Sequence, residues 1–169
     1  MPDPDLARAI RRRWTTGVAI VTTTAPDGAL RGATIGSLMM LSQDPPTLAF
    51  ALARESSFHA LLDDGAVIAL AILDREGEFL ADRFAGRAPV PDARFGGIPH
   101  TMIEIAGAAT PVLTGRAVLA WAGCRVTNVA ATGDHALVLA ALLTGAVGDD
   151  TDDPLLYYEG HYRGLEVAR

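Results

Sequence analysis

Residues 116–148 read RAVLAWAGCRVTNVAATGDHALVLAALLTGAVG, which is the clearest β-strand pattern in the chain. From 116 to 130 its side chains alternate between two sets, as the two faces of a β-strand require. Gly133 and Asp134 then turn the chain into a second apolar run, HALVLAALL. We therefore predict two long strands joined by a tight turn and buried for much of their length.

Shorter runs on the N-terminal side of this stretch also predict strands. They are GVAIVTTT (17–24), a run beginning near Arg31, TLAFAL (47–52) and AVIALAIL (66–73). The turn sequence APDG joins the first two runs as a hairpin, and Asp44-Pro45-Pro46 breaks the chain before the third. These strands outnumber the crossovers of a doubly wound parallel sheet, so we predict a mainly β (α+β) fold, a closed or split β-barrel with a few flanking helices.

Three short segments carry helix signals. Asp3 followed by Pro4 is typical of an N-cap and a first helical position, with apolar residues recurring at helical spacing after them. Ser56 can cap a short helix through Leu62, and Asp74 can cap another that ends near Gly86. A loop rich in proline and glycine follows, containing Pro89, Pro91, Gly96, Gly97 and Pro99.

Length and composition set limits on the class of protein. The chain has 169 residues and is 50% hydrophobic, which suits one domain over residues 1–169. Its net charge is −6 and it contains no lysine, so we expect no nucleic acid partner. Its longest apolar stretches are far shorter than the ~20 residues of a membrane-spanning helix. The N-terminus lacks a secretory signal pattern, so we expect a cytoplasmic protein with no membrane partner.

Several common catalytic motifs are missing. The chain has neither a G-x-G-x-x-G motif after a strand nor a P-loop, and G-x-S-x-G is absent. The four histidines never fall at the spacing of a helical zinc site, so we expect no metal. Cys124 is the single cysteine, which excludes an intrachain disulfide and predicts a packing role in the core.

Two segments could approach a ligand closely. In GATIGSLMMLS (32–42) small and hydroxyl residues leave backbone N–H groups accessible. In RESSFH (54–59) Ser56 and Ser57 begin the predicted helix, whose positive end favours a phosphate. Ordinary turn and capping chemistry explains both segments equally well, so neither one decides the function by itself.

Taken in order along the chain, further segments match one known family. They are TGVAIVTT, GATIGSLMMLSQDPP, ARESSFHALL, LADRFAGR, DARFGGIP, LAWAGCRV, TGDHALVLAAL and PLLYYEGHYRGL. The chain thereby resembles the flavin reductase-like family of FMN-binding split barrels, from about Arg12 to Leu165. The resemblance implies a homodimer of Greek-key barrels, with the flavin in a groove to which both subunits contribute.

The resemblance also implies which residues bind the ligands. Five loop residues would meet the isoalloxazine edge: Thr34, Ile35, Gly36, Ser37 and Leu38. Ser56 and its neighbour Ser57 would hold the phosphate, and Arg83 and Phe84 correspond to a further flavin contact. The NAD(P)H side would be formed by His135, Tyr157, Gly160 and Tyr162. The simpler alternative is a turn histidine at 135 and tyrosines that only pack an end of the barrel.

The activity that this resemblance implies is NAD(P)H-dependent flavin reduction. Hydride would pass from nicotinamide C4 to flavin N5, with FMN or FAD as the flavin and NADH or NADPH as the co-substrate. The organic chemistry belongs to the cofactors, so no catalytic acid or base is required of the protein. The reduced flavin would be oxidised in place or released to a partner monooxygenase.

Four positions depart from the family pattern. Gly36, Met39, Met40 and Phe58 stand where the family usually has a hydroxyl residue. Losing two or three hydrogen bonds at ~1 kcal/mol each would weaken flavin binding by about one to three orders of magnitude. The chain could then treat flavin as a passing substrate. An alternative is a non-catalytic flavin-binding or sensor protein of the same fold, and a third reading is a split barrel that uses haem or a deazaflavin.

Overall fold

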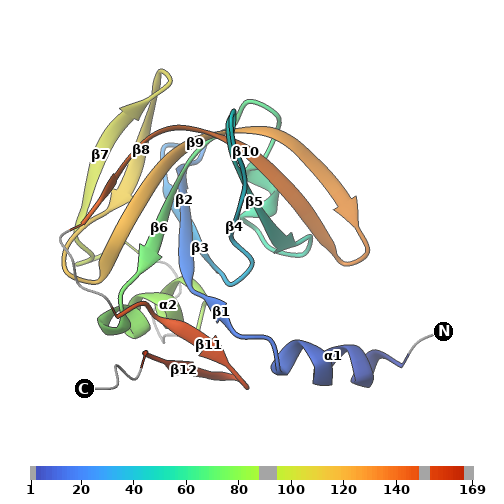
Figure 1. Ribbon diagram of the computed structural model, residues 1–169. Coiled ribbons are helices and arrows are strands. Elements are labelled where there is room, and N and C mark those ends of the chain that lie inside the picture. The colour runs from blue at the N-terminus through green and yellow to red at the C-terminus, as the bar shows by residue number, and fades with distance from the viewer. Residues whose placement is uncertain (1–2, 88–94, 149–152, 166–169) are drawn as a thin grey trace.

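A curled sheet of seven antiparallel strands forms the body of the molecule in the computed structural model, which describes residues 3–87, 95–148 and 153–165 (Figure 1). The spatial order of the strands is β3-β2-β6-β9-β10-β5-β4. Their bounds are Ala19–Thr24 (β2), Leu30–Ile35 (β3), Met39–Gln43 (β4), Pro46–Ala53 (β5), Val67–Leu73 (β6), Val118–Thr132 (β9) and His135–Val147 (β10).

The strand order is that of a Greek-key barrel. Hairpins join β2 to β3, β4 to β5, and β9 to β10, while β3 and β4 are the two edge strands of the sheet. The chain therefore crosses the open end of the barrel between residues 35 and 39. In the β9–β10 hairpin, Gly133 takes a φ of +60°, a conformation that glycine adopts without strain. The predicted split barrel with a few flanking helices is confirmed.

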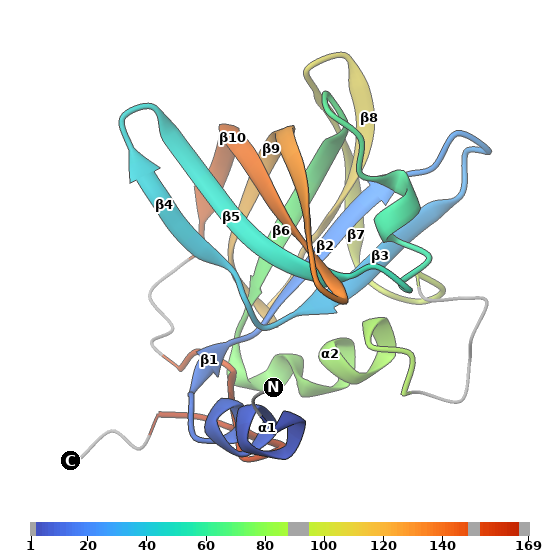
Figure 2. The ribbon, with the colours of Figure 1, turned by 90° about the vertical axis from the view of Figure 1, so that its right-hand side faces the viewer.

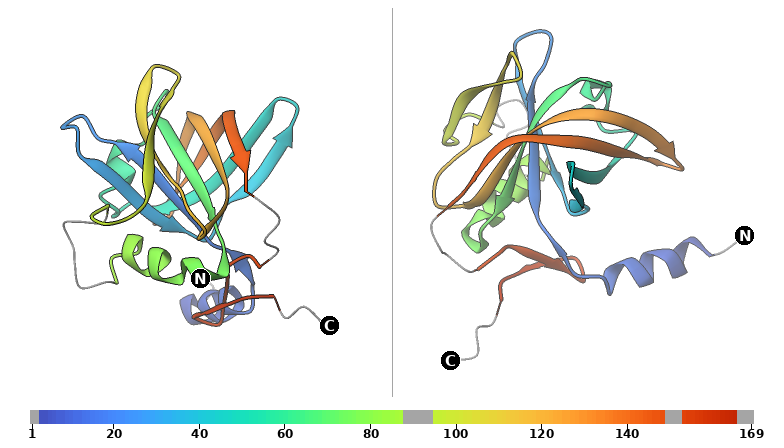
Figure 3. Two further views of the ribbon diagram at one scale, coloured as in Figure 1. Left: turned by 90° about the vertical axis from the view of Figure 1, so that its left-hand side faces the viewer. Right: turned by 45° about the horizontal axis from the view of Figure 1, so that its top comes forward.

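Two smaller sheets flank the barrel, and the sequence analysis predicted neither. Strands β7 (His100–Ile105) and β8 (Ala108–Leu113) form a hairpin that stands beside β6 (Figure 3). Strands β1 (Thr16–Gly17), β11 (Leu156–Tyr158) and β12 (His161–Arg163) form a three-stranded sheet. Most of the predicted proline-rich loop, residues 88–94, lies outside the described residues.

Two of the three predicted helices are present. Helix α1 (Pro4–Arg12) begins at Asp3, whose carboxylate accepts a hydrogen bond from the Asp5 N–H at 2.9 Å. The 3₁₀ turn Arg75–Gly77 leads into helix α2 (Glu78–Phe84), which lies beneath the barrel (Figure 2). No helix in the described ranges is long and apolar enough to cross a membrane.

The predicted helix from Ser56 to Leu62 forms only in part. The Ser56 hydroxyl accepts a hydrogen bond from the Phe58 N–H at 3.2 Å, as a capping residue does. The helical segment itself is one 3₁₀ turn, His59–Leu61, with hydrogen bonds to carbonyls three residues back. A segment this short gains few hydrogen bonds of the α-helical type for the entropy of nucleation, so the tighter turn is favoured. The expected positive end of a helix, which was to bind a phosphate, is therefore missing.

Among the described residues the core has three clusters: a main one inside the barrel, a second between the barrel and α2, and a small third one between the barrel and the β7–β8 hairpin. Phe50, Ile68 and Val138 lie in the first, and Leu80 and Phe84 in the second. The prediction that β9 and β10 are buried for much of their length is wrong in this chain. Both strands extend past their neighbours, and residues 143–147 of β10 are exposed because no core lies beneath them.

Cys124 lies in the main core cluster, as predicted, and is fully buried. Burial raises the pKa of its thiol to about 12. Because the thiolate is the reactive form, only about one molecule in ten thousand carries it at pH 8. We expect no reaction of the folded protein with a disulfide reagent such as DTNB, and one equivalent of released chromophore after unfolding in urea. Rapid stoichiometric labelling of the folded protein would contradict this packing.

Candidate active site

A cavity of about 380 Å³ opens where the barrel is split, between β3 and β5. The end of α2 and residue 135 of β10 complete its wall. Six residues that the sequence analysis assigned to ligand binding meet there: Thr34, Ile35, Ser56, Ser57, Phe84 and His135. The other lining residues are Ala33, Ala51, Leu52, Ala53 and Ala85.

Ser37 closes the barrel at one end of this split. Its hydroxyl donates to the Ala51 carbonyl at 2.9 Å and accepts from the Ala51 N–H at 2.8 Å. The Ser37 side chain thus links two segments whose backbones form no hydrogen bonds with each other in the sheet, and it takes the place of one backbone hydrogen-bonded pair. Ser37 is therefore occupied with Ala51, outside the cavity wall, although the family pattern assigns it to the isoalloxazine edge.

We expect Ser37→Ala to loosen the split. Both Ala51 backbone groups lose their side-chain partner, which costs about 1–3 kcal/mol in the free energy of unfolding. Urea denaturation measures this cost, and hydrogen exchange at the Ala51 amide should accelerate with it. Ser42→Ala on β4 is the matched substitution away from the split. Equal stability and equal exchange in both variants would contradict the role of this contact.

Three other predicted flavin residues do not line the cavity. Arg83 donates to the Gly96 carbonyl at 2.7 Å, and Leu38 packs against the main core. Gly36 lies against β1, where an added Cβ would come within 3.1 Å of the Thr16 hydroxyl. Thr34 does line the cavity, but its hydroxyl donates to the Ala81 carbonyl at 2.6 Å and so ties β3 to α2.

The ring of Phe84 forms the apolar wall of the cavity at the end of α2. It packs directly on Gly32, where an added Cβ would come within 2.6 Å of two ring carbons. Phe95 meets the same ring edge to face, with 5.1 Å between centroids. The backbone of Gly32 therefore approaches an aromatic side chain of this chain, and it is this approach that lets α2 reach the split.

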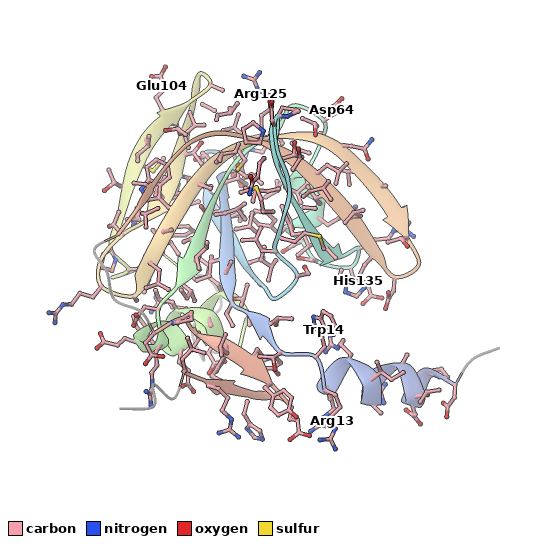
Figure 4. The ribbon with its side chains drawn as sticks, in the orientation of Figure 1. Arg13, Trp14, Asp64, Glu104, Arg125 and His135 are labelled. Carbon is pink, nitrogen blue, oxygen red and sulfur yellow. The ribbon has the colours of Figure 1, made fainter. Side chains whose placement is uncertain are left out.

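His135 is held by its neighbour at the cavity rim (Figure 4). Its Nδ1 lies 2.7 Å from Asp134 Oδ1, and its backbone pairs with Ala53 across the ladder. The hydrogen bond to His135 lowers the pKa of the Asp134 carboxyl below its ordinary value. With Nδ1 engaged by the carboxylate, Nε2 is the ring nitrogen left for a ligand.

The remaining predicted NAD(P)H residues lie elsewhere. Tyr157 and Tyr162 stack edge to face at 5.4 Å in the β1-β11-β12 sheet, and the Arg87 guanidinium lies over the Tyr157 ring. Burial raises the pKa of Tyr162 to about 12. Gly160 sits in the turn between β11 and β12. None of these three residues lines the cavity within this chain.

The four departures from the family pattern also lie outside the cavity wall. Phe58 is a core residue, 2% exposed. Met39 and Met40 are on β4, and Met40 lines a separate apolar groove. Gly36 lies against β1, as described above. The expected loss of hydrogen bonds to flavin, and the sensor reading that it motivated, therefore have no support in the geometry.

Sequence reasoning missed the alanines of the cavity wall and a basic residue near its rim. The backbone N–H of Arg54 donates to the Asp134 carbonyl and its guanidinium to the Gly133 carbonyl, at 3.0 and 3.2 Å. Arg54 thereby ties the end of β5 to the β9–β10 turn beside His135. These residues become neighbours of His135 only through the pairing of β5 with β10. No local sequence motif indicates that pairing. Within the described ranges no cluster of metal-ligating side chains exists.

The residues of the cavity fit a flavin in chemistry. Ile35, Leu52 and Phe84 offer apolar contact for a flat ring, while Ser56 and Ser57 bring hydroxyl groups to the same wall. A volume of about 380 Å³ lies in the range of small-molecule sites. The cavity wall thus combines apolar side chains with two serines and a histidine.

Comparisons with known proteins agree with this chemistry. The family described as the flavin reductase like domain matches residues 11–166. The chain is 30% identical to the FMN reductase (NADH) SmoA of Agrobacterium fabrum, covering 96% of this chain and 88% of that one. It is also 30% identical to HsaB, the reductase subunit of a flavin-dependent monooxygenase of Rhodococcus jostii, covering 97% and 79%.

A solved structure is similar over almost the whole chain. The crystal structure of a flavin reductase domain protein from Arthrobacter sp. FB24 superposes with a TM-score of 0.85 at 29% identity, covering 99% of this chain and 98% of that one. The prediction of an oxidoreductase that reduces flavin is confirmed by these relatives. The fold, the cavity and the match over residues 11–166 lead to one conclusion: this chain belongs to the flavin reductase-like domain family.

Proposed function

We propose that this chain oxidises NADH and passes the hydride to FMN bound at the split of the barrel. One observation carries the proposal: six predicted ligand-binding residues, from four separate segments of the sequence, line a single cavity. Relatives named as NADH-dependent FMN reductases support the choice of both co-substrates.

The residues of this chain position and shield the reacting groups. A flavin held here would supply the hydride acceptor, and solvent would supply the accompanying proton. Phe84 and Ile35 would exclude water from one wall, and Ser56 and Ser57 would hold the polar tail. His135, held by Asp134, would place Nε2 toward the nicotinamide carboxamide. Holding the nicotinamide and flavin rings in a reactive orientation can lower the barrier to hydride transfer by several kcal/mol, roughly the lower part of the range for oriented reactants. This effect requires no acid or base.

We also propose a homodimer that delivers reduced flavin to a partner monooxygenase. An apolar groove of about 580 Å³ lies between β4 and β10, with Met40, Ile72 and Leu143 exposed on it. Large exposed apolar surfaces of this kind mark protein interfaces. A second copy could then bring Tyr157, Gly160 and Tyr162 to the NAD(P)H side of the site. The relative named as a monooxygenase reductase subunit supports the delivery step.

The test is NADH consumption by purified protein, followed by absorbance with FMN or FAD, and repeated with NADPH. We expect FMN-dependent oxidation with NADH preferred. Equilibrium dialysis against FMN should also show one bound flavin per chain. Flavin binding without any nucleotide oxidation would overturn the proposal in favour of a sensor, and an absence of bound FMN would remove the flavin site itself.

We expect His135→Ala to raise KM for NADH about tenfold with kcat nearly unchanged. The variant loses a hydrogen bond to the nucleotide that is present in the ground state and the transition state alike, and such a bond contributes ~1 kcal/mol or somewhat more. Steady-state kinetics at saturating FMN separates KM from kcat. His100→Ala, on β7 away from the cavity, is the matched control. Equal KM values in the two variants would leave His135 without the assigned role.

A further inference from the structure

Helix α1 has an apolar stripe that nothing in this chain covers. None of its residues is buried, and Figure 3 shows the helix projecting from the body. Leu6 and Ile10, at i and i+4, share one face, and Trp14 follows them just past the helix end. Their exposed fractions are 57%, 63% and 74%. Large apolar side chains aligned in this way are typical of a helix that packs on a partner.

The end of α1 that joins the body is firmly held. Arg12 Nη2 donates to the Glu159 carbonyl at 3.1 Å, and the Glu159 N–H donates to the Arg12 carbonyl at 3.2 Å. Arg13 forms an ion pair with the Glu159 carboxylate at 3.0 Å, and its contacts with Tyr158 and Glu159 raise its pKa. Trp14 leaves the chain on the side opposite to Arg13 (Figure 4). The C-terminal end of α1 is therefore anchored to the body, and the helix is directed outward from it.

Charge favours a second copy of this chain as the partner. Residues 3–13 carry four arginines and two aspartates, a net charge of +2. The whole chain carries −6, so the rest of it carries −8. A basic helix on an acidic body is attracted to the body of another copy.

The same chain also has an apolar groove that matches the apolar stripe of α1. The apolar groove between β4 and β10 holds about 580 Å³, and none of the residues that line it is charged. A projecting apolar stripe and a receiving apolar groove on one chain can both be satisfied in a two-fold pair, each copy giving its helix to the other. Both surfaces are then covered, which neither is in the single chain.

We propose that α1 is an arm that docks Leu6, Ile10 and Trp14 in the apolar groove of a second copy. The arm rests on the proposed homodimer and adds the element that holds it together. Each copy docks its helix α1 in the apolar groove of the other copy, so the two contacts of the dimer are identical.

The first test compares two double variants with the same change in charge. Leu6→Glu with Ile10→Glu alters the apolar face, and Arg8→Gln with Arg11→Gln alters the opposite face, each lowering the net charge by two. We expect the first to raise the dimer dissociation constant at least about a hundredfold and the second to change it less than about tenfold, measured by sedimentation. NADH oxidation with FMN is assayed in parallel.

The outcomes separate the arm from the proposed reductase. Dimers of equal strength in both variants, or a wild-type chain that sediments as a monomer, would overturn the arm whether or not NADH is oxidised. Weakening confined to the Glu variant supports the arm even if the wild-type chain fails to reduce flavin. Because both replaced residues are exposed in the single chain, the barrel itself should keep its thermal unfolding transition at low concentration.

The second test locates the groove as the receiving surface. Ile10→Cys combined with Leu143→Cys places the two accessible thiols of the chain on the arm and on the groove, because Cys124 is buried. A bismaleimide should then produce a covalent dimer in denaturing gels, and neither single variant should. Intrachain linkage alone, or no linkage in a preparation that sediments as a dimer, would overturn docking in the groove.

Discussion

FMN-dependent NADH oxidation should fall at least about a hundredfold when Ala53 is replaced by tryptophan. Ala53 lines the cavity from the end of β5, opposite His135 in the ladder. An indole at this position takes up space that the flavin ring needs. A steric cost of ~3 kcal/mol on the complex already lowers binding about a hundredfold. Measuring FMN affinity by fluorescence titration together with turnover shows whether the loss occurs in binding.

The barrel itself should tolerate this change. Ala53 is half-buried and faces the cavity, and its backbone keeps its place beside β10. Ala130→Trp, exposed on β9, is the matched control and should retain full activity. An Ala53→Trp protein with wild-type FMN affinity and a wild-type unfolding transition would show that flavin binds somewhere other than at this split.

Replacing Phe84 by alanine should lower the free energy of unfolding by about 3–5 kcal/mol. The ring is 1% exposed, packs on the backbone of Gly32, and meets Phe95 edge to face. Its loss leaves a hole between α2 and β3 that the sheet cannot close without moving Thr34 and its hydrogen bond to Ala81. Urea denaturation of the protein without flavin measures this cost directly.

Phe79 provides the comparison within the same helix. It is 57% exposed, so Phe79→Ala should change the free energy of unfolding by no more than about 0.5 kcal/mol. Phe84→Leu keeps most of the buried volume and should recover much of the stability. Equal losses at 79 and 84 would mean that α2 contributes through its backbone rather than through the ring at the cavity.

Local sequence patterns by themselves indicate most strands of the barrel and the starts of its helical segments. Alternation and β-branched runs set β2, β5, β6, β9 and β10, because the period of two is a property of the strand itself. Asp3 and Asp74 marked the starts of helical segments by capping, which is equally local. The order of segments along the chain was enough to indicate the family and to name six residues of the cavity.

Tertiary structure decided which of those residues face a ligand. Ser37 and Thr34 had the right chemistry, yet their hydroxyl groups are engaged by Ala51 and Ala81 on other elements. Such partners are 14 and 47 residues away, and no local period encodes them. The unpredicted β7–β8 hairpin and the overhanging end of β10 have the same origin. The register of the strands and the curl of the sheet bring segments that are distant in sequence side by side. They therefore determine which side-chain atoms at the split remain accessible to a ligand.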